Sequence, residues 1–292
     1  MGAFGYVAPA TLDEALTVLS EHANLGRRAQ VLAGGTDLLV QMRSTDREPR
    51  TIVDIKRLAE TNRLEVGTDV IFIGAAVPSA VLNENAELVA RLPGLLEAAD
   101  LIGSTQIQGR ASIGGNLCNS SPAGDTIPAL IAVGAVCEIA GSGGTRELPV
   151  EDFCTGVGIN ALEPDEFLVG LRIKTPPARS ADAYLRFIPR TEMDIAVVGA
   201  GVCLTLDEGG TCTAARFGLG AVAARPLLVT EAADALIGST VDGAALARLA
   251  EAASAACRPI DDKRGTKEYR IKVAGVLARR AAEIALARAR ES

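Results

Sequence analysis

Residues Ala33-Gly34-Gly35-Thr36-Asp37 and Ser112-Ile113-Gly114-Gly115-Asn116 are two glycine-rich segments about eighty positions apart. Each has an apolar or strand-like run on one side, and neither matches G-x-G-x-x-G or G-x-x-x-x-G-K-[ST]. Paired glycines let the backbone approach a ligand closely and turn its N–H groups inward, so each segment can cradle an anion. Two cradles in one chain indicate a ligand with two phosphates gripped from both sides. A dinucleotide pyrophosphate is the obvious candidate.

Together with two further stretches, these segments resemble the FAD-binding subunit of molybdenum hydroxylases, the family of xanthine and carbon monoxide dehydrogenases. The combination is specific to the family, although either glycine pair alone would not be, and the resemblance covers essentially the whole chain. It implies a two-part FAD-binding region of the vanillyl-alcohol-oxidase-like type, followed by a C-terminal domain of the carbon monoxide dehydrogenase flavoprotein type. The further stretches are Asn119-Ser120-Ser121-Pro122-Ala123-Gly124-Asp125-Thr126-Ile127-Pro128-Ala129 and Asp262-Lys263-Arg264-Gly265-Thr266-Lys267-Glu268-Tyr269-Arg270.

The residue pattern divides the chain into three units and predicts an α+β fold class. Residues 1–60 are expected to form a small parallel α/β unit, in which a helix opens with a capping box at Thr11 and two strands flank the first glycine loop. Residues 61–176 are expected to form a mixed-sheet unit, and residues 177–292 a domain of strands followed by helices. The expected strands are 30–32, 51–55, 70–75, 136–139, 167–173, 183–188, 195–206 and 212–222; the expected helices are 37–42, 78–97, 126–135, 228–237, 243–256 and 266–290.

Composition excludes several classes of function. The chain has 292 residues with a net charge of −7, no Trp and 3% aromatic residues, which argues against a nucleic-acid partner. It has no run of 18 apolar residues that could span a membrane and no secretory signal at its N-terminus, so a cytoplasmic protein is expected.

Cysteine and histidine usage restricts the chemistry further. The six cysteines include no C-x-x-C pair, so neither zinc nor an iron–sulfur cluster is expected on this chain. His22 is the sole histidine and lies in a predicted helix, far from both glycine loops, so non-covalent FAD is expected. Cys118, close to the second loop, is the formal alternative as a covalent anchor.

No catalytic side chain is needed, because the cofactor carries the redox step. Thr36 is expected to bond a phosphate oxygen, whereas Asp37 either faces the ligand or caps the following helix. The resemblance implies that Asp125 bonds the adenosine ribose, that Leu168 forms an apolar wall against the flavin ring, and that Arg190 is a cation near that ring; a helix cap, a strand core and a solvated edge are their respective structural alternatives. The expected cofactor-binding residues are Leu32, Ala33, Gly34, Gly35, Thr36, Asp37, Gly103, Ser112, Ile113, Gly114, Gly115, Asn116, Asp125, Leu168 and Arg190.

The resemblance therefore implies an oxidoreductase subunit that binds FAD and passes electrons from iron–sulfur clusters to an external acceptor. The molybdenum cofactor and [2Fe-2S] clusters are expected only on an iron–sulfur subunit and a molybdenum-cofactor subunit, assembled as a dimer of heterotrimers. A stand-alone flavin oxidase or dehydrogenase and a non-enzymatic assembly protein are the alternatives. An NAD-binding site at Gly218-x-Gly220-x-x-Ala223 is disfavoured, since Pro226 follows where a helix would have to begin. Thr36-Asp37 differs from the A-G-G-H-S loop of carbon monoxide dehydrogenase, and the loop resembles that of purine, aromatic or N-heterocycle hydroxylases more closely, so the substrate stays open.

Overall fold

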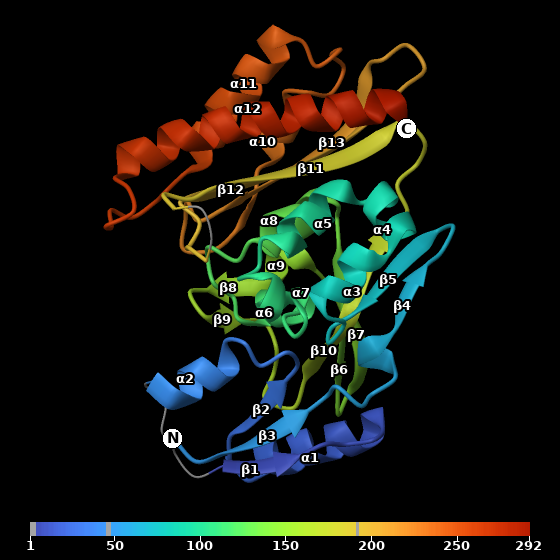
Figure 1. The fold of residues 1–292 in the computed structure, drawn as a ribbon, viewed down its shortest axis with the longest axis vertical. Coiled ribbons are helices and arrows are strands. Elements are labelled where there is room, and N and C mark those ends of the chain that lie inside the picture. Colours follow the sequence, from blue (N-terminus) through green and yellow to red (C-terminus); the bar gives the residue numbers. More distant parts are fainter. Residues whose placement is uncertain (1–3, 45–47, 191–192) are drawn as a thin grey trace.

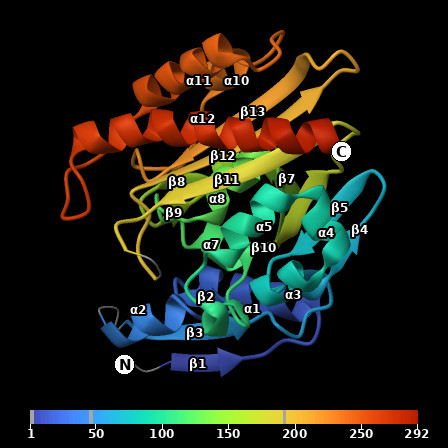
Figure 2. The same cartoon turned by 45° about the horizontal axis from the view of Figure 1, so that its top comes forward.

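Three main β-sheets follow one another along the long axis of the molecule, each accompanied by helices (Figure 1). The computed structural model describes residues 4–44, 48–190 and 193–292. The view in Figure 2 shows the same order, with the N-terminal sheet at one end and the C-terminal helices at the other. The fold is the expected α+β class.

The first unit is a three-stranded parallel sheet in the order β1-β3-β2. The helix predicted from the capping box begins as expected, because the Thr11 side chain accepts a hydrogen bond from the Glu14 N–H at 3.3 Å. Strand β1 was not expected. The elements are β1 (Phe4–Val7), α1 (Leu12–Asn24), β2 (Ala29–Leu32), α2 (Leu38–Ser44), β3 (Arg50–Asp54) and a short 3-10 helix (Glu60–Asn62).

The second unit is a five-stranded sheet in the order β4-β5-β10-β6-β7, and all four pairings are antiparallel. A mixed sheet was expected here, but the sheet is purely antiparallel. Short turns join β4 to β5 and β6 to β7, as such turns connect antiparallel strands, and β10 runs antiparallel to both β5 and β6 between these two hairpins. The elements are β4 (Leu64–Val66), β5 (Val70–Gly74), α3 (Ser79–Glu84), α4 (Ala86–Arg91), α5 (Pro93–Asp100), α6 (Thr105–Gln108), α7 (Ile113–Cys118), α8 (Thr126–Ala132), β6 (Val136–Gly141), β7 (Gly144–Pro149), α9 (Val150–Phe153), β8 (Cys154–Gly156), β9 (Ile159–Asn160) and β10 (Phe167–Lys174).

The third unit has strands followed by helices, as predicted. Its glycine-rich strands pack closely on the second unit, because a Cβ on Gly218 would lie 2.3 Å from the carbonyl oxygen of Pro128. These glycines therefore serve packing and not a dinucleotide fingerprint. The elements are β11 (Ser180–Phe187), β12 (Val198–Leu206), β13 (Cys212–Gly220), β14 (Leu227–Leu228), α10 (Thr230–Asp234), α11 (Gly243–Ala256) and α12 (Lys267–Glu291).

The cores of the units are continuous with one another where they meet. Leu19 of α1 and Ile55 after β3 belong to the same buried cluster as Phe167 at the start of β10. This cluster fixes the parallel sheet against the five-stranded sheet and thereby determines how the two glycine loops face each other. In the described part of the chain, no helix is both long and apolar enough to cross a membrane.

Candidate functional site

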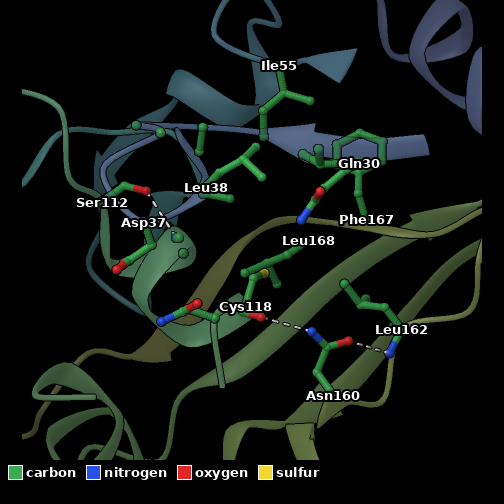
Figure 3. Close-up of a pocket in the computed structure, with 18 of the residues that line it drawn as sticks. Gln30, Asp37, Leu38, Ile55, Ser112, Cys118, Asn160, Leu162, Phe167 and Leu168 are labelled. Carbon is green, nitrogen blue, oxygen red and sulfur yellow. Dashed lines mark hydrogen bonds between the residues drawn. The ribbon is translucent and has the colours of Figure 1, made fainter. Parts of the chain in front are cut away.

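The two glycine segments, far apart in sequence, line one pocket between the first and second units (Figure 3). The pocket has a volume of about 470 Å³ and is framed by β2, α2, α7 and the start of β10. Ten of the expected residues line it: Ala33, Gly34, Gly35, Thr36, Asp37, Ser112, Gly114, Gly115, Asn116 and Leu168.

Each of the four glycines in the two loops is needed for a different structural reason. A Cβ on Gly34 would lie 1.9 Å from the carbonyl oxygen of Arg110, so this glycine lets the first loop touch the segment that leads into the second. Gly35 has a φ of +80°, a left-handed conformation that favours glycine. Gly114 packs against Ala75, since a Cβ at this position would lie 2.6 Å from the Ala75 backbone. Gly115 differs, because its Cβ position meets only the Ser112 side chain, at 3.1 Å, and otherwise faces open space.

Backbone N–H groups of the first loop are available to a ligand. Within the described chain, the N–H groups of Gly34, Gly35 and Thr36 have no protein acceptor. In the second loop, the Ser112 hydroxyl accepts a hydrogen bond from the Gly115 N–H at 3.0 Å and shapes the turn. Unpaired N–H groups beside a cavity that a Cβ would fill are the features of an anion cradle. The residues present therefore fit a diphosphate.

Lys56 holds the first loop from behind. Its ammonium donates to the Ala33 carbonyl oxygen at 3.1 Å and to the Asp54 carboxylate at 2.7 Å. Because carbonyl and N–H point in opposite directions across a trans peptide, this contact turns the Gly34 N–H away from Lys56. Burial alone would raise the pKa of Asp54, but hydrogen bonds from Lys56 and Tyr6 lower it, so the carboxylate stays ionised beside the ammonium.

Beyond the loops, the pocket lining has an apolar part, which we call the slot, and also includes the charged residues Arg28, Glu163 and Glu166. The walls of the slot are the side chains of Leu19, Ile55, Phe167 and Leu168, each 1–2% exposed. Leu168 thus faces the pocket, in addition to being part of the strand core. Apolar walls with the polar side chain of Gln30 at their edge suit a flat heterocyclic ring (Figure 3).

Asp37 lies in the pocket lining, and desolvation there raises its pKa. Its side chain makes no hydrogen bond among the described residues, so it does not cap α2. Asn116 is also engaged: its Oδ1 accepts from the Thr126 hydroxyl at 2.7 Å, which ties the second loop to the start of α8.

Asp125 is not in the pocket lining, although it was expected to contact the ligand. Its carboxylate is bonded to Arg186 at 3.0 Å and to the Tyr184 hydroxyl at 3.2 Å, and it makes no helix-cap bond. Burial raises its pKa to about 6, although Arg186 opposes the shift. The pair lies just behind the pocket, since Arg186 also donates to the carbonyl of Leu101, next to lining residue Ile102.

Four further expected residues lie outside the lining. Arg190 is exposed and pairs with Asp194 at 3.0 Å, outside the pocket lining. Leu32 packs against Leu38 and Ile113 is buried in the core of the second unit, while Gly103 forms a left-handed turn at φ +65°. The pattern that suggested these residues is local, whereas access to the pocket is decided by packing.

Cys118 lines the pocket as a neutral thiol. Burial raises its pKa to about 12, so little nucleophilic thiolate forms near neutral pH. All six cysteines are free, and among the described residues no cluster of three His, Cys, Asp or Glu side chains could hold a metal ion.

Sequence reasoning missed Gln30, Lys56, Phe167 and Asn160, which line or support the pocket. Lys56 follows a predicted strand and was detectable only as a cation near the end of that strand. Gln30 lies on β2, just before the first loop, whereas Phe167 and Asn160 reach the site through the packing of distant segments; Asn160 donates from Nδ2 to the Cys118 carbonyl at 3.0 Å.

Two family models match the chain. Residues 2–176 match the FAD binding domain in molybdopterin dehydrogenase, and residues 183–285 match the CO dehydrogenase flavoprotein C-terminal domain. The carbon monoxide dehydrogenase medium chain of Afipia carboxidovorans is 38% identical over 99% of both chains. The nicotinate dehydrogenase FAD-subunit of Eubacterium barkeri is 33% identical, over 81% of this chain and 80% of that protein.

Solved structures show the same similarity. A Cu,Mo-CO dehydrogenase chain superposes with a TM-score of 0.92 at 35% identity, covering 98% of this chain and 99% of that one. A chain of quinoline 2-oxidoreductase from Pseudomonas putida 86 gives a TM-score of 0.88 at 28% identity, covering 98% of each. Relatives with different named substrates therefore share this architecture.

Proposed function

Since the chain belongs to the family of FAD-binding subunits of molybdenum hydroxylases, we propose that its two glycine loops hold the pyrophosphate of FAD. The observation that carries this proposal is the shared pocket, into which the unpaired N–H groups of Gly34, Gly35 and Thr36 open opposite Gly115. The chain functions as the electron-transfer flavoprotein subunit of an oxidoreductase.

The protein's part in the chemistry is binding and orientation. Bound FAD supplies a two-electron redox centre that exchanges electrons with partners on either side. The loop N–H groups and the Thr36 hydroxyl offset the pyrophosphate charge, and Lys56 keeps the Gly34 N–H directed at it. The buried Asp125–Arg186 pair lies behind Ile102 and fixes the backbone there, so its contribution is positional.

The relatives are chains of multi-subunit dehydrogenases, which implies iron–sulfur and molybdenum-cofactor subunits as partners. We further propose a dimer of heterotrimers in the cytoplasm. A divided reaction is supported by the relatives that are named as separate FAD subunits, those of a nicotinate dehydrogenase and of a xanthine dehydrogenase. Hydroxylation then takes place on the molybdenum subunit, whose substrate this pocket does not contact.

Purification of the chain with its partner subunits tests the proposal. Stoichiometric FAD, with a visible flavin spectrum that is bleached by substrate only when the partners are present, is the expected result. Acid treatment should release intact FAD into the supernatant. A chain that binds no flavin, or that oxidises substrate alone, would contradict the proposal.

A further inference from the structure

Gln30 carries a hydrogen-bond donor whose direction is fixed by the protein. The Arg50 guanidinium donates from Nη1 to the Gln30 side-chain oxygen at 2.8 Å. Arginine has five N–H donors and no acceptor, so the oxygen of Gln30, and not its nitrogen, must face Arg50. The orientation of this amide therefore follows from chemistry.

The remaining NH2 group of Gln30 faces the pocket. Gln30 belongs to the pocket lining, and among the described residues no protein acceptor receives a hydrogen bond from its Nε2. Figure 3 shows this nitrogen directed toward the open space between Ile55 and Leu168. A fixed, unused donor at the edge of an apolar slot is the arrangement with which proteins select a flat heterocycle that bears a ring acceptor.

The slot beside Gln30 suits the adenine ring better than the isoalloxazine ring. Leu19, Phe167 and Leu168 are buried side chains of the cores of the first and second units, so a ring packed on them lies against the interior of the molecule, while the exposed residues Arg28 and Glu163 leave the pocket open to solvent. The flavin must present an edge to its electron donor and acceptor, whereas adenine takes no part in the chemistry.

We infer that Gln30, oriented by Arg50, is a specificity residue that donates a hydrogen bond to the adenine ring of FAD in the Leu168 slot. This assignment rests on the proposed cofactor site and gives Leu168 a role different from the flavin wall that the family resemblance implied. Arg50 is the positioning residue, because it touches the glutamine and not the ligand.

Three ligands separate the possibilities. FAD carries both the flavin and the adenine, FMN carries the flavin and one phosphate, and ADP carries the adenine and the diphosphate. Calorimetric titration of the flavin-free chain with each ligand measures which half of FAD a substitution affects. Gln30→Leu removes the donor, and Gln30→Glu removes it while keeping an acceptor for Arg50. Gln106→Leu, at an exposed glutamine of α6 outside the lining, is the matched control.

Both Gln30 variants are expected to weaken FAD and ADP binding about five- to tenfold, the effect of one lost hydrogen bond, and to change FMN binding less than about twofold. Gln106→Leu should bind all three like the wild type. If Gln30→Leu does not fold, Gln30→Glu decides the matter. Equal losses for FAD and FMN would place the flavin in the slot, and unchanged FAD binding in a folded variant would remove Gln30 from recognition; either result overturns the inference. Failure of the wild-type chain to bind FAD would instead refute the proposed function.

Discussion

Two adjacent glycines of α7 should respond in opposite ways to the same substitution. A Cβ at position 114 would lie 2.6 Å from the Cα and the carbonyl oxygen of Ala75, which directly follows β5 and is hydrogen-bonded to Val169 of β10. A Cβ at position 115 would meet only the Ser112 hydroxyl, at 3.1 Å, and would otherwise enter the pocket. Gly114→Ala is therefore a test of packing and Gly115→Ala a test of ligand approach.

The magnitudes follow from these contacts. Replacing glycine by alanine inside a helix gains up to about 1 kcal/mol of intrinsic stability at either position. At Gly114, forcing a methyl group into the backbone costs about 1–3 kcal/mol or more, so the free energy of unfolding should fall. At Gly115, the tight contact with Ser112 offsets part of the gain, and the free energy of unfolding should stay within about 1 kcal/mol of the wild type.

FAD binding should show the reverse order of sensitivity. A methyl group at position 115 would enter the pocket and displace the pyrophosphate from the unpaired N–H groups of Gly34, Gly35 and Thr36 on the facing loop. Loss of one charge-assisted hydrogen bond costs about 1.5–3 kcal/mol, or about 10- to 150-fold in Kd.

Urea denaturation of the flavin-free chain and calorimetric titration with FAD measure the two quantities separately. Gly115→Ala with wild-type FAD affinity would refute the assignment of the second loop. Gly114→Ala with unchanged stability would refute the packing argument. Gly34→Ala belongs with Gly114→Ala, because its Cβ would lie 1.9 Å from the Arg110 carbonyl oxygen, so loss of flavin there would not by itself identify a ligand contact.

Lys56→Met should weaken FAD binding about tenfold in a folded chain, because the Ala33 carbonyl loses the ammonium that orients the Gly34 N–H. Lys174→Met, at an exposed lysine of β10, is the control. Equal FAD affinity of the two variants would contradict the role of Lys56. Cys118→Ser should bind flavin and release it on acid treatment, as the wild type should. If acid released flavin from the variant but not from the wild-type polypeptide, a covalent bond to Cys118 would be shown. Asp182 is buried, and desolvation raises its pKa to about 6 despite hydrogen bonds from the N–H groups of Gly94 and Leu95. Since this folded-state pKa exceeds the unfolded value of about 3.9, the folded state binds the proton more tightly, and the free energy of unfolding should fall by up to about 3 kcal/mol as pH rises from about 4 to 6. Asp125, whose pKa is also raised to about 6, contributes a fall of its own, so denaturation curves of Asp182→Asn should show a fall smaller than that of the wild type by up to about 3 kcal/mol across this range. A parallel pH dependence in both proteins would contradict the role of Asp182.

Local chemistry was enough to predict the glycine loops and most regular elements. The capping box at Thr11, the strands beside the first loop and helix α11 all lie where residue patterns placed them. Strand β1 was not predicted from the sequence, because all four of its residues are exposed and it therefore has no buried face and no hydrophobic alternation. The region after Pro78 was expected to be mainly helical, and it divides into α3, α4 and α5, with Asn85 accepting the Leu88 N–H to begin a new helix.

The pocket side chains that matter beyond the loops could not be predicted in the same way. Gln30 and Phe167 are more than a hundred residues apart and line the same pocket because the parallel sheet packs on the five-stranded sheet. Asp125 and Arg190 have the charges expected of ligand contacts, but each is engaged by a partner on the third unit or its adjoining turn. Sequence spacing gives the residue type at a position, whereas the direction of a side chain depends on contacts that only the folded chain defines.

Gly34 and Gly114 show why the cradle and the fold are one arrangement. A ligand is not the only reason for either glycine, because a Cβ would collide with protein backbone at both positions: with Arg110 at Gly34 and with Ala75 at Gly114. The Gly34 contact brings the first loop against the segment that leads into the second, and the Gly114 contact seats the second loop on the backbone after β5, so the two loops are positioned before any ligand binds. A site preorganised in this way loses less conformational freedom on binding. The family's glycine signature therefore encodes an assembly of two loops, and Gly115, the glycine with open space in front of it, is where that assembly admits the cofactor.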